Sequence, residues 1–257
     1  MEHGIANISI IPVRKEASHR AEMVTQLLYG ETYTIEGKTK NWLEIKIDHD
    51  GYIGWMDALQ HCPNSANFTI AENSSLTFDV WHPLQLKNEH IPIVMASKLY
   101  KFDGINCKTF NSKKATYNGL AVDLKKFDFS NEKLIKTAYK YLNTPYLWGG
   151  RSPMGIDCSG FVQNVFQYFN VWLPRDASQQ ANIGTAVGFV EQAKPGDLAF
   201  FDRAEDGHII HVGIILEDKK IIHASGKVKI DSIDHHGIFS KAQNKYTHTL
   251  RIIKRVV

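Results

Sequence analysis

Residues 146–169, YLWGGRSPMGIDCSGFVQNVFQYF, join a stretch that cannot be helical to one with helical periodicity. Pro153 and three nearby glycines disfavour a helix in the first part. From Cys158 onward, apolar residues recur at the spacing of one helix face. These residues are Phe161, Val162, Val165, Phe166 and Phe169. The sequence therefore predicts a helix that begins near Cys158, preceded by a loop.

Cys158 is the residue of this stretch with the most reactive side chain. A cysteine in the first turn of a helix meets unpaired backbone N–H groups and the positive end of the helix dipole, which favour the thiolate. Most free cysteines are instead buried small hydrophobes. Asp157, Ser159 and Gly160 favour reactivity here, because they are polar or leave room for a ligand. We predict that Cys158 is a nucleophile, and Asp157 also suits the N-cap.

The composition is that of a folded protein with room for one large domain or two or three small ones. Of its 257 residues, 43% are hydrophobic and 22% charged. A net charge of +3 without a Lys/Arg block gives no reason to expect nucleic acid or an anionic membrane as a partner. Cys62, Cys107 and Cys158 are odd in number and far apart, which fits neither a disulfide framework nor a zinc knuckle. A reducing compartment is predicted.

The first residues mix charged and polar side chains where a signal peptide has a basic segment and an apolar run. No apolar stretch approaches the length of a membrane span. If Met1 is the native start, we expect a cytoplasmic protein. If a signal peptide has been removed, we expect a periplasmic or extracellular one.

The first half of the chain is a series of short strand-like segments divided by glycines and polar turns. Within residues 1–60, the order of the short segments resembles that of a bacterial SH3-like domain. The segments are PVR, a polar turn, a Gly-Glu turn, a Trp-led strand and GYIGW. Residues 61–128 repeat the style with FTIAE, LTFDVW, IPIVMASKLYKF and TYNGLAVDL. We interpret them as a second, divergent SH3-like barrel. The alternative is an irregular β-rich connector.

The pattern changes near Phe129, where Ser130 resembles an N-cap and LIKTAYKYL has helical spacing. After the helix at Cys158, Leu173 to Gln180 predicts a Pro-led turn and a short helical run. The turn Lys194 to Asp197 then leads into LAFF, followed by HIIHVGIIL and KKIIHAS. Helices followed by antiparallel strands predict an α+β domain over residues 129–257.

A thiolate that attacks an amide needs a base and a group that orients the base. His211 and His223 are candidates on two strands of a hairpin, although His208, His235 and His236 lie in the same half of the chain. Side chains alternate along strands, so the two histidines share a face only if paired residue numbers have an even sum. We predict a turn of three or five residues, which meets this condition.

Five short motifs in order resemble the signature of NlpC-type cell-wall cysteine peptidases. They are DCSG at Cys158, Arg175-Asp176, PGDL at Pro195, HVGI at His211 and IHAS at His223. The resemblance spans residues 130–257 and implies a papain-like α+β domain. It also implies that Cys158 is the nucleophile, His211 the general base and His223 the orienting residue.

Two SH3-like barrels ahead of this domain make the chain similar to γ-D-glutamyl-L-diamino acid endopeptidases of this family. The resemblance implies murein stem peptides, L-Ala-γ-D-Glu-diamino acid, as the substrate, and a free N-terminal L-Ala. Pairing with that ammonium needs an acidic group in a desolvated cleft, and Asp176 is the best match. The resemblance also implies that Glu22 and Tyr52 contact the substrate. The alternative is that Glu22 is an ordinary surface carboxylate and Tyr52 an ordinary aromatic residue of the barrel. One residue departs from the family's pattern, because Ala177 follows Asp176 where relatives carry a hydroxyl.

Three residues around the thiol are further candidates for substrate binding. Trp148 either walls the substrate pocket or packs beneath its loop. Asp157 and Ser159 are candidates for hydrogen bonds to the substrate, and the Cys158 backbone N–H for the oxyanion. No metal, cofactor or obligate protein partner is expected.

Three other interpretations stay open from the sequence. In the first the chain is an inactive module that binds wall peptides, in the second it is an NlpC-type amidase of different bond specificity, and in the third it is a zinc protein. The zinc site would use Cys158, His211 and His223 with Asp157, although no ligand pair has the usual zinc spacing.

Overall fold

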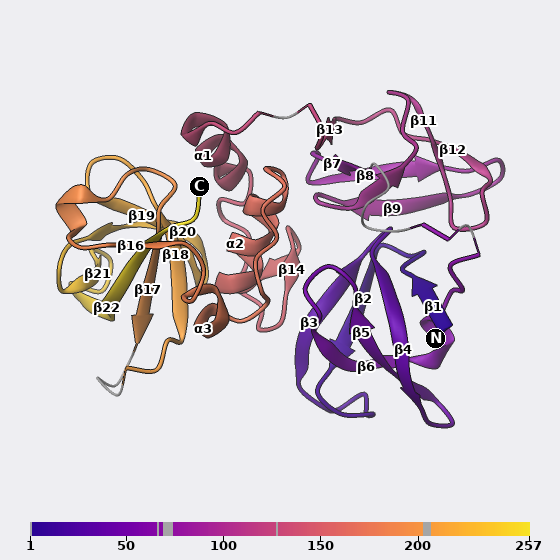
Figure 1. Cartoon of the computed structure of the whole chain (residues 1–257), viewed down its shortest axis with the longest axis horizontal. Coiled ribbons are helices and arrows are strands. Elements are labelled where there is room, and N and C mark those ends of the chain that lie inside the picture. The colour runs from indigo at the N-terminus through magenta and orange to yellow at the C-terminus, as the bar shows by residue number, and fades with distance from the viewer. Residues whose placement is uncertain (1, 66, 69–73, 127, 203–206) are drawn as a thin grey trace. The chain divides into compact units, whose positions relative to one another are not determined.

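The computed structural model of the chain describes all residues except 1, 66, 69–73, 127 and 203–206 (Figure 1). The residues form two compact units. Unit 1 comprises Met1–Asp128 and Trp148–Pro153, and unit 2 comprises Phe129–Leu147 and Met154–Val257. The strand predicted at FTIAE falls largely outside the described residues. Among the helices that are described, none has the length and apolarity needed to cross a membrane.

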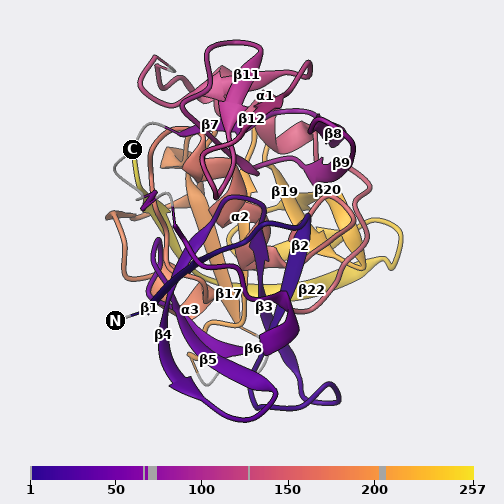
Figure 2. The same cartoon turned by 90° about the vertical axis from the view of Figure 1, so that its right-hand side faces the viewer.

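The first sheet of unit 1 has six antiparallel strands in the order β1-β4-β5-β6-β2-β3 (Figure 2). Alternating apolar residues such as Leu43, Ile45 and Ile47 point into one core, as expected for strands with one buried face. The predicted series of short strands is confirmed for this region. Their bounds are β1 (Glu2–Ile5), β2 (Ile10–Arg14), β3 (Met23–Leu28), β4 (Thr32–Lys38), β5 (Trp42–Ile47) and β6 (Ile53–Asp57), followed by the 3-10 helix η1 (Ala58–Gln60).

The second sheet of unit 1 has seven strands in the order β13-β7-β10-β11-β12-β8-β9. It has its own core, built on Leu84, Ile93 and Leu99. The region is therefore more regular than the connector considered as an alternative, and its relation to SH3-like barrels stays a prediction. The strands are β7 (Ser74–Thr77), β8 (Trp81–Gln85), β9 (His90–Val94), β10 (Lys98–Tyr100), β11 (Asn106–Lys108), β12 (Lys114–Thr116) and β13 (Ala121–Asp123).

Backbone and aromatic contacts join the two sheets of unit 1. The Lys98 N–H donates to the Tyr29 carbonyl at 2.8 Å, and the Tyr100 hydroxyl donates to the Gly30 carbonyl at 2.8 Å. Tyr100 also stacks on Phe68, with ring centroids 4.2 Å apart. The start of β10 is therefore held against the turn between β3 and β4.

A short segment from the middle of the chain, Trp148–Pro153, belongs to unit 1. Gly149 has φ +74°, and a Cβ there would lie 2.4 Å from the Met23 carbonyl oxygen, so only glycine fits. The Arg151 N–H donates to Oε1 of Gln26 on β3 at 2.8 Å. Arg151 is also the first residue of β14 (Arg151–Ser152). The glycine loop predicted ahead of the nucleophile is thus docked on β3.

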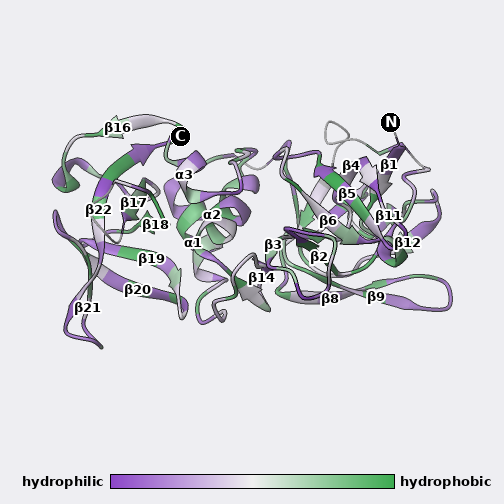
Figure 3. Cartoon of the chain, turned by 90° about the horizontal axis from the view of Figure 1, so that it is seen from below, coloured by the Kyte–Doolittle hydropathy of each residue, from purple (hydrophilic) through white to green (hydrophobic). Residues whose placement is uncertain are grey.

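Unit 2 begins with helices, as predicted. The Ser130 hydroxyl accepts a hydrogen bond from the Lys133 N–H, so the predicted N-cap is confirmed. Every residue of α2 is buried, although Figure 3 shows hydrophilic as well as hydrophobic colouring in this region. The bounds are α1 (Asn131–Tyr139), β15 (Gly155–Ile156), α2 (Cys158–Gln167), α3 (Ala177–Gln180) and the 3-10 helix η2 (Val190–Gln192).

The strands of unit 2 close into a barrel. The sheet order is β16-β22-β17-β18-β19-β20-β21, and β21 also pairs with β22. Ile215, Ile221 and Ile233 belong to the core on one face of these strands. Helices followed by antiparallel strands agree with the α+β prediction, although strand dominates. The bounds are β16 (Thr185–Val187), β17 (Leu198–Asp202), β18 (His211–Ile215), β19 (Lys220–Ser225), β20 (Lys227–Ile233), β21 (Gly237–Ser240) and β22 (Lys245–Arg255).

Candidate active site

Cys158 is the first residue of α2, as predicted. Asp157 caps the helix, because its Oδ1 accepts a hydrogen bond from the Gly160 N–H at 2.7 Å. The backbone N–H groups of Val212 and Ser159 donate to the Cys158 sulfur. Val212 follows His211 on β18, so the thiol lies beside the strand that carries the predicted base.

The thiol itself is buried, with Cys158 only 6% exposed. Burial raises the pKa of Cys158 to about 12, and the Asp157 carboxylate adds to the rise, against the two N–H donors and Arg175. The backbone N–H donors lower the pKa of Cys158, as predicted, but loss of hydration outweighs them and the thiol is favoured. Thiolate formation at neutral pH needs a base that accepts the proton.

The two predicted histidines meet on one face of the hairpin. Gly213 pairs with His223, which places His211 diagonally across from His223. The N–H of Leu216 bonds to the Lys220 carbonyl across a three-residue turn, so the predicted odd-length turn is confirmed. Nε2 of His211 and Nδ1 of His223 lie 2.8 Å apart, and the rings are nearly perpendicular at 83°.

Asp231 on β20 extends this pair into a line of hydrogen bonds. Its Oδ2 lies 3.1 Å from Nε2 of His223, and the Lys229 ammonium lies 2.9 Å from the same oxygen. Burial lowers the pKa of His223, while Asp231 opposes this shift. His223 is therefore a neutral ring at neutral pH, held at both nitrogens.

A third imidazole packs against the predicted base. The ring of His248 on β22 stacks on His211, with centroids 4.2 Å apart and planes 24° apart. On its other side the Thr247 hydroxyl lies 2.9 Å from Nδ1 of His248. The stacking restricts rotation of the His211 ring about its Cβ–Cγ bond.

A buried polar network lies at the start of α2. The guanidinium of Arg175 donates to both carboxylate oxygens of Asp157 and, at 2.8 Å, to the Ser159 hydroxyl. Gln180 on α3 donates to the Ser159 carbonyl at 3.1 Å. The predicted N-cap role of Asp157 is confirmed. Substrate binding by Asp157 and Ser159 stays a prediction, and the structure shows both engaged inside the domain.

Asp176 occupies the N-cap position of α3, next to the buried Arg175. Its side chain makes no capping hydrogen bond to that helix. The position is partly exposed, whereas Arg175 is 2% exposed. The placement leaves open the predicted role of Asp176 in binding an ammonium.

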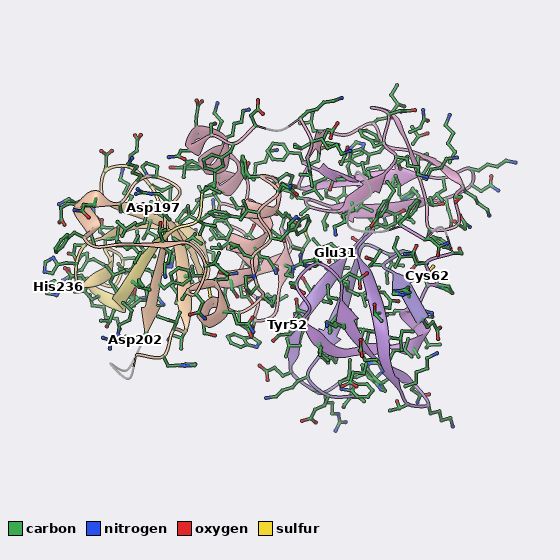
Figure 4. All side chains as sticks on the ribbon, viewed as in Figure 1. Glu31, Tyr52, Cys62, Asp197, Asp202 and His236 are labelled. Atoms are coloured by element: carbon green, nitrogen blue, oxygen red, sulfur yellow. The ribbon has the colours of Figure 1, made fainter. Side chains whose placement is uncertain are left out.

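The other predicted substrate-binding residues lie in unit 1. Nε1 of Trp148 donates to Oε1 of Glu22 at 2.7 Å, so the structure brings these two together. Trp148 is 59% exposed and therefore does not pack beneath its loop. Tyr52 lies between β5 and β6 and packs against the core of the first sheet (Figure 4).

Throughout the described part of the chain, no three His, Cys, Asp or Glu side chains are grouped so that they could bind a metal ion. In the line of hydrogen bonds, both nitrogens of His223 already face protein partners. The chemistry that these residues support is proton transfer.

Asp231 and His248 were missed by sequence reasoning. Asp231 is a charged residue within the strand-like run KVKIDSI, which is a weak signal, since such residues are commonly exposed. His248 lies in a run of polar residues near the end of the chain. Neither signal identifies a partner without the pairing of strands.

A thiol at a helix N-terminus, next to the strand that carries an imidazole paired with a second imidazole, is the arrangement expected of a cysteine peptidase. Residues 143–248 match the NlpC/P60 family, and residues 13–59 match the bacterial dipeptidyl-peptidase SH3 domain. The chain therefore contains an NlpC/P60 domain and a bacterial dipeptidyl-peptidase SH3 domain, which confirms the resemblance found in its motifs.

Two curated relatives span most of the chain. The gamma-D-glutamyl-L-lysine dipeptidyl-peptidase of Bacillus subtilis (strain 168) is 29% identical over 212 residues, covering 78% of this chain and 71% of the relative. The protein of the same name from Bacillus cereus is 27% identical, covering 79% and 67%. The crystal structure of an NlpC/P60 family protein from Bacillus cereus aligns with a TM-score of 0.86 over 99% of each chain at 20% identity. This last likeness shows a shared fold.

Proposed function

We propose that the chain is a cysteine endopeptidase that hydrolyses the bond between γ-D-Glu and an L-diamino acid in murein stem peptides with a free N-terminal L-Ala. The observations that carry the proposal are the 2.8 Å contact between His211 and His223 and the hydrogen bond from the N–H of Val212, the residue after His211, to the Cys158 sulfur. The choice of bond is supported by two relatives from Bacillus species, both of which are named gamma-D-glutamyl-L-lysine dipeptidyl-peptidase. Peptide recycling or remodelling is the proposed role.

The reaction begins with transfer of the Cys158 proton to His211. The sulfur attacks the carbonyl carbon of the γ-glutamyl amide, and the oxyanion accepts a hydrogen bond from the Cys158 backbone N–H. His211 then gives its proton to the departing amine, the C–N bond breaks and a thioester forms. Water, deprotonated by His211, hydrolyses the thioester. The products are the free diamino acid end and L-Ala-γ-D-Glu, and the thiol is restored.

Selection for short peptides needs recognition of their free amine. We assign this role to Asp176, because a carboxylate in a desolvated site discriminates an ammonium from an acetylated amine. Glu22 and Tyr52 of the SH3-like domain, and Trp148 of the loop before Cys158, are proposed as further contacts to the substrate. Cytoplasmic location, expected if Met1 is the native start, belongs to this proposal and is checked by cell fractionation.

The test is mass-spectrometric product analysis with L-Ala-γ-D-Glu-diaminopimelate, with the L-Ala amine free or acetylated. We expect the wild-type chain to release diaminopimelate from the free-amine peptide and to leave the acetylated one intact. Cys158→Ala is expected to release none. Cys62→Ala is the matched control, since it removes another buried thiol and should retain activity.

The outcomes separate the alternative functions. Binding of the peptide without cleavage by the wild-type chain points to an inactive binding module. Cleavage at another amide points to a different bond specificity. Equal turnover of the two peptides removes the amine-recognition role of Asp176 and leaves the peptidase assignment in place.

A further inference from the structure

We infer that Asp231 is a positioning residue of the reaction, which fixes the ring tautomers of His223 and His211 so that His211 can accept the Cys158 proton. The inference deepens the proposed function and rests on it for the identity of the reaction. The geometry that carries it is independent of the substrate.

The hydrogen bonds from His211 through His223 to Asp231 all have their donor on the His211 side. An ionised carboxylate only accepts hydrogen bonds, so Nε2 of His223 carries a hydrogen and donates it to Asp231. Nδ1 of His223 is then the acceptor in the 2.8 Å contact, and Nε2 of His211 is the donor. A neutral imidazole carries one N–H hydrogen. Since that hydrogen is on Nε2 of His211, Nδ1 carries none and is able to accept a proton.

Asp231 is ionised at neutral pH. Its hydrogen bond with His223 and its contact with Lys229 lower the pKa of the Asp231 carboxyl below its usual range, against partial burial. Its side chain is 11% exposed and that of His223 is 0% exposed. The carboxylate therefore shields the far end of the ring pair from solvent and carries a negative charge there.

The position of Asp231 follows from strand pairing. Lys229 pairs with His223 and Asp231 with Ile221, so Asp231 reaches His223 diagonally on the same face. The same face carries the core residues Ile215 and Ile233. Inside such a core, an imidazolium on His211 has little water to stabilise it. A carboxylate two rings away offsets part of that cost.

Several titratable or charged groups surround this line and contribute to its pH response. They are Cys158 and Asp157 at the start of α2, Arg175 before α3, His211 on β18, His223 on β19, Lys229 on β20 and His248 on β22. Lys229 offsets part of the Asp231 charge. Lys229 does not offset the effect of Asp231 on the ring tautomers, because that effect depends on the Asp231 oxygen that accepts the hydrogen bond from His223.

Without Asp231, the direction of the line is no longer set. His223 can then carry its hydrogen on Nδ1 and donate to Nε2 of His211, which places the His211 hydrogen on Nδ1. That tautomer cannot accept the thiol proton. Replacement by alanine therefore removes both the acceptor and the charge, whereas asparagine removes the charge, retains one acceptor oxygen and replaces the other by an NH2 donor.

The experiment compares Asp231→Asn, Asp231→Ala and the control Asp234→Asn in the full chain. Asp234 is a suitable control because it bonds to Tyr246 and the His236 N–H rather than to the ring pair. Two readouts are measured against pH: kcat/KM for L-Ala-γ-D-Glu-diaminopimelate and the alkylation rate of Cys158 by iodoacetamide. Circular dichroism checks that each variant is folded.

We expect kcat/KM to fall about tenfold in Asp231→Asn and about 100-fold in Asp231→Ala. In both variants the acid limb of the two pH profiles moves to higher pH, because the thiolate–imidazolium pair forms less readily. Asp234→Asn should match the wild type. Wild-type profiles in both Asp231 variants, or equal losses in Asp234→Asn, overturn the inference. If the wild-type chain does not cleave the peptide, the proposed function fails, and the alkylation profile still decides the role of Asp231.

Discussion

The guanidinium of Arg151 and the carboxylate of Glu31 form a two-bond ion pair that is closed off from solvent. Nη1 and Nη2 donate to the two carboxylate oxygens at 2.8 and 2.9 Å, and both side chains are 0% exposed. Nη1 also donates to the Gln26 carbonyl at 2.8 Å. The pair fixes the segment Trp148–Pro153 on the first sheet of unit 1, and this segment ends shortly before Asp157, where the nucleophile's motif begins.

Removing one partner of this pair is expected to destabilise unit 1 strongly. Glu31→Gln leaves the Arg151 charge buried without its counter-charge, which typically costs about 3–5 kcal/mol. The free energy of unfolding is measured by urea titration at pH 7. Lys38→Gln is the control, because it breaks an ion pair with Glu2 that is about half exposed and should change the unfolding free energy little. Equal effects of the two substitutions contradict the prediction.

The same cluster makes unit 1 sensitive to acid. Burial lowers the pKa of His49 to about 4, against the attraction of Glu31. Burial alone raises the pKa of Glu31, but Arg151 and His49 outweigh it and lower the pKa to about 2. Both groups bind protons more readily in the unfolded chain. The stabilisation from His49 is therefore complete above pH 6.5 and is lost as the pH falls toward 4, and that from Glu31 is lost below pH 4.5.

Unfolding free energies at pH 7, 5.5 and 4.5 test this acid sensitivity. We expect the wild-type value to fall between pH 6.5 and 4 by up to about 1.4 kcal/mol per pH unit. His49→Gln should make the slope shallower in that window, because one group that gains a proton there on unfolding is removed. An unchanged slope in His49→Gln assigns the acid sensitivity to other groups.

The parts of the site that follow from local sequence were predictable. Pro153 and the glycines exclude a helix before Cys158, and Asp157 supplies a cap, so the start of α2 follows from chemistry within a few residues. The face shared by His211 and His223 follows from strand alternation once an odd-length turn is chosen. Both depend on short-range rules.

The parts that were missed depend on pairing and burial. Asp231 reaches His223 only through the register of β19 and β20, which is set by a turn at Gly226 with φ +72°. Arg151 and Glu31 are 120 residues apart, and no periodicity links them. The pKa of Cys158 depends on how completely the fold excludes water from the sulfur. No local pattern reports that.

Reactivity of Cys158 should depend on His211 far more than on the helix N-terminus. Burial holds the pKa of Cys158 at about 12, so without a base almost no thiolate forms at pH 7. We expect His211→Asn to reduce the iodoacetamide labelling rate of Cys158 at pH 7 by at least about 100-fold. Labelling is read by mass spectrometry of the peptide that contains Cys158.

Cys158→Ala measures the background from the other two thiols. Burial raises the pKa of Cys62 to about 11 and that of Cys107 to about 12, so both should label slowly. Similar labelling of Cys158 in His211→Asn and in the wild type shows that the thiolate forms without the imidazole. The assignment of His211 as base is then lost.

The pair of Asp157 and Arg175 should affect stability and thiol reactivity in opposite directions. Asp157→Asn keeps a side-chain acceptor at the N-cap but leaves the buried Arg175 guanidinium without a counter-charge. We expect the free energy of unfolding of unit 2 to fall by about 3 kcal/mol. Ser130→Ala, which removes only the N-cap of α1, should cost about 1 kcal/mol.

Thiol reactivity in Asp157→Asn distinguishes this pair from a purely structural contact. The Asp157 carboxylate raises the pKa of Cys158 and Arg175 lowers it. Removing the carboxylate leaves the cation in place, so the pKa of Cys158 should fall and the alkylation profile should move to lower pH. Ser130→Ala destabilises the same unit without changing the charge near the sulfur, so its profile should match the wild type. A shift to higher pH in Asp157→Asn means that misplacement of α2, rather than charge, controls the thiol in that variant.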